Sequence, residues 1–217
     1  MSQNNLHFKG KFITFEGIDF SGKSVQSKIL YQKLVDHKIE TLFLRDPGAT
    51  RISERIRAIL LDNKNNEMSI WTELLLYEAA RAQMVQEAIL PALAAGKIVI
   101  CDRFYDSTTA YQGYGRQLDL GIVSRANSLG ACGVTPDLTY IIDLDVTTAI
   151  ERRIKLNKRA DRLESEGLEF QNRVRNGYLQ IAKKESKRIF LLNGDRAIEK
   201  LSDEIFLIFN NRFKLIE

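Results

Sequence analysis

The feature that most constrains this chain is a glycine-containing turn near its start, Gly17-Ile18-Asp19-Phe20-Ser21-Gly22-Lys23-Ser24, which fits the pattern G-x-x-x-x-G-K-[ST] in full. An apolar run precedes the turn and a helical pattern follows it, which is the context that this phosphate-binding loop requires. Gly17 and Gly22 let the backbone turn its N–H groups toward phosphate oxygens, and the following helix adds a positive dipole end. The alternative is a simple turn between a strand and a helix, but the full motif in its required context favours a phosphate site.

All eight residues of this loop, 17–24, are predicted to bind a nucleoside triphosphate. Lys23 is expected to reach the β- and γ-phosphates, and the Ser24 hydroxyl is expected to ligate Mg²⁺. GTPases, ATPases and small-molecule kinases all contain such a loop, so the motif alone does not choose among them.

Short apolar runs alternate with longer helical patterns along the chain, which predicts an α/β fold. The runs are nearly continuous in apolar residues, as expected for parallel strands that helices cover on both faces. They span residues 12–15, 41–44, 98–101, 138–142 and 188–192. Spacings of three and four from Leu74 to Ile89 predict a helix, which we expect Pro91 to end or kink. The sequence therefore predicts a five-stranded parallel sheet between two helical layers.

The bulk composition limits the class of protein. With 217 residues, of which 44% are hydrophobic, the chain suits one domain spanning 1–217. No signal-peptide pattern or membrane-spanning run stands out, so we expect a cytoplasmic protein with no membrane partner. Two cysteines and two histidines at wide spacing favour neither a disulfide framework nor a zinc site. The net charge of +4 suits nucleotides or nucleic acid without choosing between them.

A basic segment, residues 152–162, differs from its surroundings. Its basic residues are Arg152, Arg153, Lys155, Lys158, Arg159 and Arg162, with Asp161 as the only acid. The thin apolar content predicts a mobile surface element rather than core. Taken alone, the segment is most simply a solvated helix face.

Four blocks resemble the thymidylate kinase family. Residues 102–116 (D-R-F-Y-D-S-T-T-A-Y-Q-G-Y-G-R) are similar to its D-R-[YFH]-x-x-S-x-x-A-Y-Q-G block, and residues 45–50 (R-D-P-G-A-T) to its R-E-P-G-G-T. Residues 77–83 resemble its F-x-A-x-R-x-Q helix, and residues 161–178 follow its D-R-x-E, F, V-R-x-x-Y pattern. The blocks run in the family's order, so together they are very specific.

The resemblance implies a three-layer P-loop kinase fold that transfers the γ-phosphoryl group of ATP to dTMP, giving dTDP and ADP, with Mg²⁺. It also implies a homodimer, with dTMP and ATP as partners and no nucleic acid. The residues expected to bind dTMP are Arg45, Pro47, Tyr77, Arg81, Arg103, Ser107, Thr108, Tyr111 and Gln112.

Each block also has a physical interpretation. Asp102 and Arg103 follow a strand, at the carboxyl edge where open α/β sheets bind ligands. Asp102 could hold Mg²⁺ through water and Arg103 could grip a phosphate, although an internal Asp–Arg pair is the alternative. The resemblance assigns Arg103 and Arg45 to the dTMP phosphate.

The resemblance also assigns residues to the base and sugar. Tyr77 and Arg81 share one helix face, and they are assigned to thymine stacking and to the O4 atom. Tyr111 is expected to occupy the place of a ribose 2′-hydroxyl, which would select deoxyribose.

Catalysis is expected to involve Lys23, Asp19, Arg103, Arg159 and Arg162. The resemblance places Asp19 near the sugar 3′-hydroxyl and the phosphates. Phe20 stands where one family subgroup has Arg, so the loop lacks that cation and residues 152–166 are expected to form a basic lid. The candidate lid cations are Arg153, Lys158, Arg159 and Arg162, and Arg162 matches the family's D-R pair. Val25, Asp46 and Ala49 are milder departures from the family pattern.

Two other functions remain open at this point. The first is a kinase of the same fold for another nucleoside monophosphate or a deoxynucleoside, against which the Tyr77/Arg81 and Tyr111/Gln112 sets argue. The second is a non-catalytic nucleotide-binding module, which would have no need of the acceptor blocks.

Overall fold

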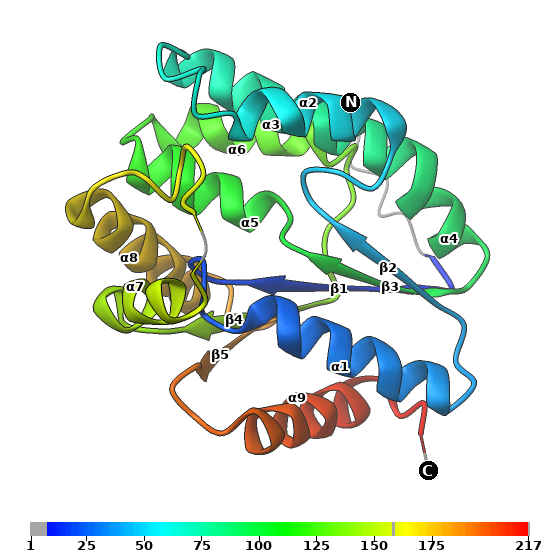
Figure 1. Cartoon of the computed structure of the whole chain (residues 1–217). Helices are drawn as coiled ribbons and strands as arrows, with labels where there is room; N and C mark the ends of the chain where they lie inside the picture. The colour runs from blue at the N-terminus through cyan, green and yellow to red at the C-terminus, as the bar shows by residue number, and fades with distance from the viewer. Residues whose placement is uncertain (1–7, 158, 217) are drawn as a thin grey trace.

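Five parallel strands form the centre of the fold, in the order β2-β3-β1-β4-β5 (Figure 1). The strands are β1 (Lys11–Glu16), β2 (Thr41–Arg45), β3 (Ile98–Asp102), β4 (Leu138–Asp143) and β5 (Ile189–Asn193). This computed structural model describes residues 8–157 and 159–216. The three inner strands are almost wholly buried, whereas the edge strands β2 and β5 are partly exposed.

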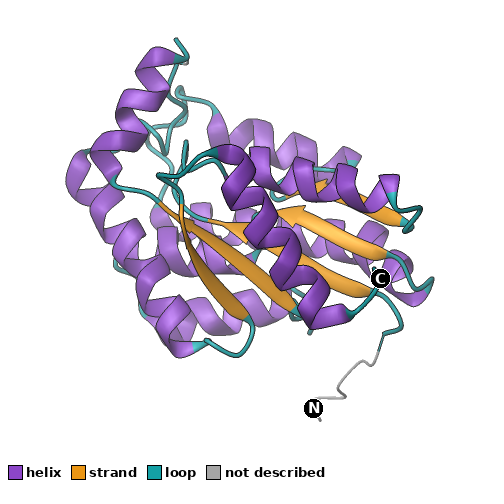
Figure 2. Ribbon diagram, turned by 90° about the horizontal axis from the view of Figure 1, so that it is seen from below, coloured by secondary structure: helices purple, strands orange, loops and turns teal. Residues whose placement is uncertain are grey.

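Helices cover both faces of the sheet (Figure 1). They are α1 (Lys23–Asp36), α2 (Arg51–Leu61), α3 (Ile70–Met84), α4 (Leu90–Ala94), α5 (Tyr105–Thr108), α6 (Leu120–Gly130), α7 (Val146–Lys155), α8 (Leu168–Lys184) and α9 (Ile198–Phe213), with π-helical turns η1 (Val85–Ile89) and η2 (Thr109–Gly115). One face packs against α1 and α9, as the view from below also shows (Figure 2). The other face packs against α3, α7, α8 and the π-helical turns. Within the described residues, no helix is long and apolar enough to cross a membrane.

The predicted three-layer fold is confirmed, and each predicted strand lies within one residue of its observed bounds. The apolar runs located the strands well because parallel strands are buried on both faces. Pro91 was predicted to end or kink the helix, but the helix does not end at Pro91. Helical structure continues to Ala94, through the wide turn η1 just before Pro91.

The basic segment differs from its prediction as a surface element. Residues 152–155 belong to α7, but Arg162 at the far end of the segment is buried. The prediction is therefore wrong for this end of the segment. Lys158, one of the candidate lid cations, lies outside the described residues.

A buried ion pair joins α5 to the start of β5. The Arg188 guanidinium donates to both carboxylate oxygens of Asp106 at 2.8 Å, and also to Thr139 Oγ1 at 2.9 Å. Both charged side chains are more than nine-tenths buried. Loss of Arg188 would remove the cation that pairs with the buried Asp106, whereas loss of Asp106 would leave Arg188 with the half-exposed Glu185, 2.6 Å from its Nε. Either change costs more than loss of an exposed pair.

We predict that Asp106→Ala lowers the free energy of unfolding by about 3 kcal/mol, because the buried Arg188 keeps its charge and loses its buried partner, retaining only the half-exposed Glu185. The matched control is Asp203→Ala in the Lys33 pair, where the aspartate side chain is 77% exposed; its expected effect is below ~1 kcal/mol. Urea unfolding of both variants checks this. Equal losses in the two variants would show that burial does not decide the energy of the Arg188 pair.

Candidate functional site

The loop after β1 has the backbone that a phosphate cradle needs. Gly17 and Gly22 have φ values of +132° and +101°, which side-chain-bearing residues rarely adopt. A Cβ atom at Gly17 would also lie 2.4 Å from the carbonyl oxygen of Ile142. Phe20 has a φ of +63°, a conformation that favours glycine, so its aromatic ring is present at the cost of backbone strain.

Lys23 and Asp19 form the charged part of this loop. Lys23 Nζ lies 3.3 Å from both Asp19 Oδ1 and the Ile18 carbonyl oxygen. Burial, and next the positive charge of Arg103, hold the pKa of Lys23 below its usual value. Burial alone would raise the pKa of Asp19, but Arg103 and Lys23 outweigh it and keep this carboxyl ionised.

Arg103 connects the phosphate loop to the residues expected to bind the acceptor. Its Nη2 lies 2.5 Å from Asp19 Oδ1 and 3.2 Å from the Tyr111 hydroxyl, and its Nη1 donates to the Gly17 carbonyl oxygen at 2.9 Å. Its backbone φ of +73° is again in the left-handed region. Strained backbone of this kind persists where the surrounding structure fixes it, often at functional sites.

The cleft beside Arg103 brings together nearly all of the predicted acceptor residues. Its volume is about 120 Å³, and its lining residues are Asp19, Asp46, Pro47, Arg57, Leu61, Tyr77, Arg81, Arg103, Ser107, Thr108, Tyr111, Gln112, Asp161, Leu163 and Glu164. Of the nine residues predicted from the sequence, Arg45 is the one that does not line it. Residues of the expected lid, 161, 163 and 164, form part of its wall.

Arg81 is fully buried, although without its family match it would have been taken for a surface residue. Its guanidinium donates to Asp46 Oδ2 and Glu78 Oε1, both at 2.6 Å, and to Thr108 Oγ1 at 2.7 Å. Asp46 and Glu78 therefore neutralise and orient it. Asp46, a departure from the family pattern, is the direct partner of Arg81.

Two elements supply the aromatic and amide side chains that line the cleft. Tyr77 comes from α3, whereas Tyr111 and Gln112 come from the π-helical turn η2. The Tyr111 hydroxyl donates to Asp19 Oδ2 at 2.9 Å, and its ring lies 5.1 Å from the Arg103 guanidinium carbon. π-helical turns are rare and recur at functional sites.

Arg45 does not line the cleft. Its guanidinium donates to both oxygens of Glu54, at 2.9 and 3.1 Å, and almost half of its side chain is exposed. Arg45 is only two residues before Pro47, which lines the cleft, but its side chain forms an ion pair with Glu54 of α2.

Glu73, buried at the start of α3, collects three donors from distant segments. Its Oε1 accepts from Gln112 at 2.8 Å, and its Oε2 accepts from Arg116 at 3.1 Å and from Arg162 at 2.6 Å. Arg162 also donates to the Leu60 carbonyl oxygen at 2.8 Å. In this arrangement Arg162 fastens the end of the basic segment to α3, whereas Arg159 is exposed.

Two acidic residues that line the cleft, Asp161 and Glu164, have raised pKa values. Burial, then Asp19 and Asp161, raise the pKa of Glu164 to about 7. Burial also raises the pKa of Asp161. Arg153, the other described candidate cation, donates to the Glu164 carbonyl oxygen at 3.1 Å.

The oxygens available for a metal ion suit Mg²⁺. Ser24 is exposed at the start of α1, and Asp102 is buried at the end of β3. Asp102 Oδ1 has no hydrogen-bond partner among the described residues. Within those residues no cluster of three or more typical metal-binding side chains occurs. Proteins usually hold Mg²⁺ through one or two oxygen-bearing side chains, water and substrate phosphates.

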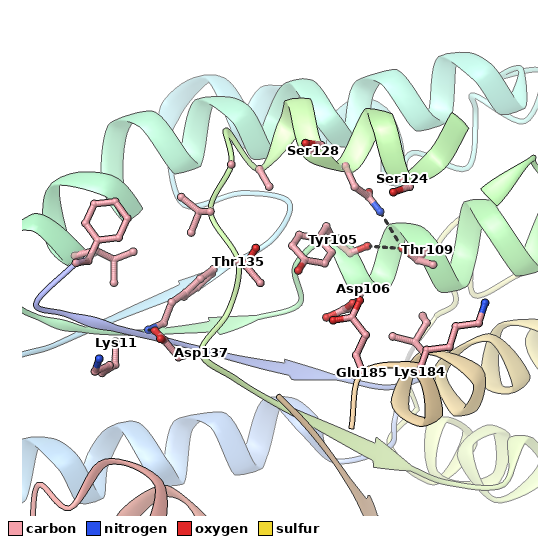
Figure 3. Close-up of a pocket in the computed structure, with 18 of the residues that line it drawn as sticks. Lys11, Tyr105, Asp106, Thr109, Ser124, Ser128, Thr135, Asp137, Lys184 and Glu185 are labelled. Atoms are coloured by element: carbon pink, nitrogen blue, oxygen red, sulfur yellow. Dashed lines mark hydrogen bonds between the residues drawn. The ribbon is translucent and has the colours of Figure 1, made fainter. Parts of the chain in front are cut away.

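A larger cavity of about 660 Å³ lies elsewhere, between α5, α6 and the end of α8 (Figure 3). Tyr105, Asp106 and Thr109 line one side of it, and Ser124 and Ser128 line another (Figure 3). No residue of the phosphate loop lines it. We therefore choose the candidate site by the convergence of charged side chains at the smaller cleft and not by cavity size.

Three residues of the site were missed from the sequence. Glu16 and Glu73 are buried acids with no motif spacing, and Arg152 was left out of the candidate cations. Arg152 Nη1 lies 3.5 Å from the Phe20 carbonyl oxygen, and Nη2 lies 3.0 Å from that of Gly194. The block Asp102–Arg103 indicated this edge of the sheet as a candidate site, but no local signal marked Glu16 or Glu73.

Comparison with known proteins gives one consistent family. The family profile described as "Thymidylate kinase" matches residues 15–205. A thymidylate kinase of Pelotomaculum thermopropionicum is 49% identical over 193 residues, covering 89% of each chain. One of Pelodictyon phaeoclathratiforme is 43% identical over 93% of this chain and 96% of its own. The crystal structure of a thymidylate kinase from Ehrlichia chaffeensis matches with a TM-score of 0.76 and 35% identity, over 93% of this chain and 98% of its own.

We predict that Arg162→Ala destabilises the protein by about 1.5–3 kcal/mol, because the buried Glu73 carboxylate loses one charged donor while it keeps Arg116 and Gln112. Arg159→Ala should leave the melting temperature unchanged, since that side chain is exposed. Thermal unfolding of the two variants checks the difference. An Arg162→Ala variant that melts like the wild type, with lowered kcat, would instead support the sequence-based role of Arg162 at the transferred phosphoryl group.

Proposed function

The chain belongs to the thymidylate kinase family, and we propose that the cleft beside Arg103 is where it transfers the γ-phosphoryl group of ATP to dTMP. The observation that supports this site is the position of Arg103. Its guanidinium contacts the phosphate loop at Gly17 and Asp19 and the acceptor cleft at Ser107 and Tyr111. A cation at this junction lies between donor and acceptor phosphates, both of which are anionic.

In the proposed reaction, a phosphate oxygen of dTMP attacks the γ-phosphorus, and the bond to the β–γ bridging oxygen of ATP breaks. The loop 17–24 binds the phosphates of ATP, with Lys23 at the β- and γ-phosphates. Arg103 holds the dTMP phosphate for in-line attack, so that catalysis is positioning and charge neutralisation. Mg²⁺, held by Ser24 and through water by Asp102, would supply positive charge at the phosphates.

Recognition of the acceptor uses the cleft wall. Tyr77 stacks on thymine, and Arg81, oriented by Asp46 and Glu78, donates to the base. Tyr111, fixed by its hydrogen bond to Asp19, blocks a ribose 2′-hydroxyl and so selects deoxyribose. Gln112 and Thr108 complete the pocket, and Arg45 would exchange Glu54 for the acceptor phosphate.

The segment 152–166 is proposed to supply a further cation as a lid. Phe20 supplies no charge in the loop, so a cation from the segment 152–166 is required at the transferred group. The burial of Arg162 against Glu73 favours Arg159 or Arg153 for this role. Arg162 then anchors the segment near the cleft.

A homodimer is a further part of the proposal. Helices α2, α3 and α6 lie side by side and expose large apolar side chains, a pattern typical of interfaces (Figure 1). These are Ile52, Ile59, Ile70, Trp71, Leu75, Leu120, Ile122 and Leu129. Light scattering that returns the mass of one chain at every concentration would contradict the dimer. The cytoplasmic location stays a prediction.

A coupled assay of ADP release with dTMP, dUMP, UMP, CMP and AMP tests the function. We expect dTMP to be the best acceptor and UMP to be poor, because of the thymine pocket and Tyr111. A better turnover with AMP or CMP would indicate another nucleoside monophosphate kinase. ATP binding without turnover of any acceptor would indicate a non-catalytic module.

We predict that Arg103→Ala weakens dTMP binding by about 2–4 kcal/mol, since a charge-assisted partner of the acceptor phosphate is lost. ATP affinity should stay near the wild-type value. Calorimetric titration of each nucleotide separately measures both. Unchanged dTMP affinity in this variant would remove Arg103 from the acceptor site.

A further inference from the structure

Glu16 is the last residue of β1, directly before the phosphate loop, and its side chain is fully buried. Its carboxylate accepts three hydrogen bonds. Oε1 accepts from the Phe104 backbone N–H at 2.7 Å, and Oε2 accepts from Ser107 Oγ at 2.6 Å and from the Tyr178 hydroxyl at 3.0 Å. None of these donors belongs to the phosphate loop.

All three donors adjoin Arg103. Phe104 is its neighbour in the chain, so the bond to Glu16 holds the peptide that follows the left-handed Arg103 backbone. Ser107 Oγ and the Tyr178 hydroxyl both accept from Arg103 Nη1, at 3.1 and 3.0 Å. Glu16 therefore supports Arg103 through its backbone and, across two hydroxyls, through its guanidinium.

Charge limits the direction of these hydrogen bonds. An ionised carboxylate only accepts and a guanidinium only donates. The Ser107 and Tyr178 hydroxyls also lie 2.8 Å apart, so at least one of them gives its proton to Glu16, and both can present a lone pair to Arg103. A neutral carboxyl or an amide at position 16 would offer a proton instead, which would turn a hydroxyl proton away from Glu16 and rearrange the hydrogen bonds that the two hydroxyls make with Arg103.

We propose that Glu16 is a positioning residue that aims Arg103 at the acceptor phosphate, by setting the orientation of the Ser107 and Tyr178 hydroxyls. This inference rests on the proposed function of Arg103. It adds a residue from β1, outside the motif 17–24, to the machinery that binds the acceptor. The end of β1 then positions both the phosphate loop, which follows it in the chain, and Arg103, which is proposed to bind the acceptor phosphate.

The ionised form of Glu16 does not stabilise the fold. Burial, and next the negative charge of Asp106 from α5, raise the pKa of Glu16 to about 7, against the opposing effects of Arg103, Ser107 and Phe104. Tyr178 from α8 is the remaining titratable group in contact with it. Because this pKa is above the usual value of 4.5, the folded state binds more protons between the two values. Stability is therefore lost as pH rises toward 7 and is not regained above it.

The direction of this pH dependence separates a positioning role of Glu16 from a role in stabilising the fold. The variant Glu16→Gln removes a buried charge, so at pH 8.5 its melting temperature should equal or exceed that of the wild type. Its KM for dTMP should rise roughly tenfold or more, as for loss of a hydrogen bond to a charged group, while its KM for ATP should change less than about twofold. Glu40→Gln, in the exposed pair with Lys97, is the control and should match the wild type.

A second set of variants keeps the test independent of folding at position 16. Ser107→Ala/Tyr178→Phe removes both hydroxyls and should raise the KM for dTMP to a similar degree. Added to Glu16→Gln, it should cause little further change, because residues that act in one chain are not additive. Full additivity of the two sets would overturn the proposal.

The remaining outcomes are also decisive. An unchanged KM for dTMP in Glu16→Gln would overturn the proposal, and so would a rise in both KM values with a lower melting temperature. If wild type phosphorylates dTMP and Arg103→Ala weakens its binding while Glu16→Gln does not, this inference alone fails. If wild type does not phosphorylate dTMP, the proposed function fails first.

Discussion

The site depends on one guanidinium held by acids from two sides. Arg103 contacts Asp19 of the phosphate loop directly and Glu16 of β1 through the Ser107 and Tyr178 hydroxyls. Asp19 keeps its charge because Arg103 and Lys23 outweigh its burial. A preorganised cation of this kind does not have to be ordered when an anionic acceptor arrives, which is how enzymes stabilise charge at small reorganisation cost.

The same region concentrates backbone strain. Phe20 and Arg103 both have positive φ values, at +63° and +73°, and both lie just beyond the carboxyl ends of neighbouring strands. Parallel strands bring these ends to one edge of the sheet, so loops far apart in sequence meet there. The inner strands hold Phe20 and Arg103 in backbone conformations that an isolated loop would not keep. The apolar core therefore helps to determine the geometry of the cleft.

The sequence predicted the fold and named most of the predicted acceptor residues that meet in one cleft, for different reasons. Strands buried on both faces produce apolar runs, and the motif 17–24 produces a fixed loop, so both were found locally. The acceptor residues came from block resemblance, and the cleft unites them except for Arg45. The buried ion pair of Arg162 was not predictable, because its partner Glu73 lies 89 residues away in the sequence and belongs to no motif. Glu16 was missed for the same reason: its three donors become neighbours only after folding.

The most direct test of the central claim compares dTMP with thymidine, which differs by the phosphate alone. If Arg103 binds the acceptor phosphate, calorimetry should show that dTMP binds roughly ten- to a hundredfold more tightly, as for hydrogen bonds to charged groups. The difference should shrink at high salt, since a partly exposed charge interaction is screened. Equal affinities for dTMP and thymidine would contradict this claim, because Arg103 would then not bind the phosphate.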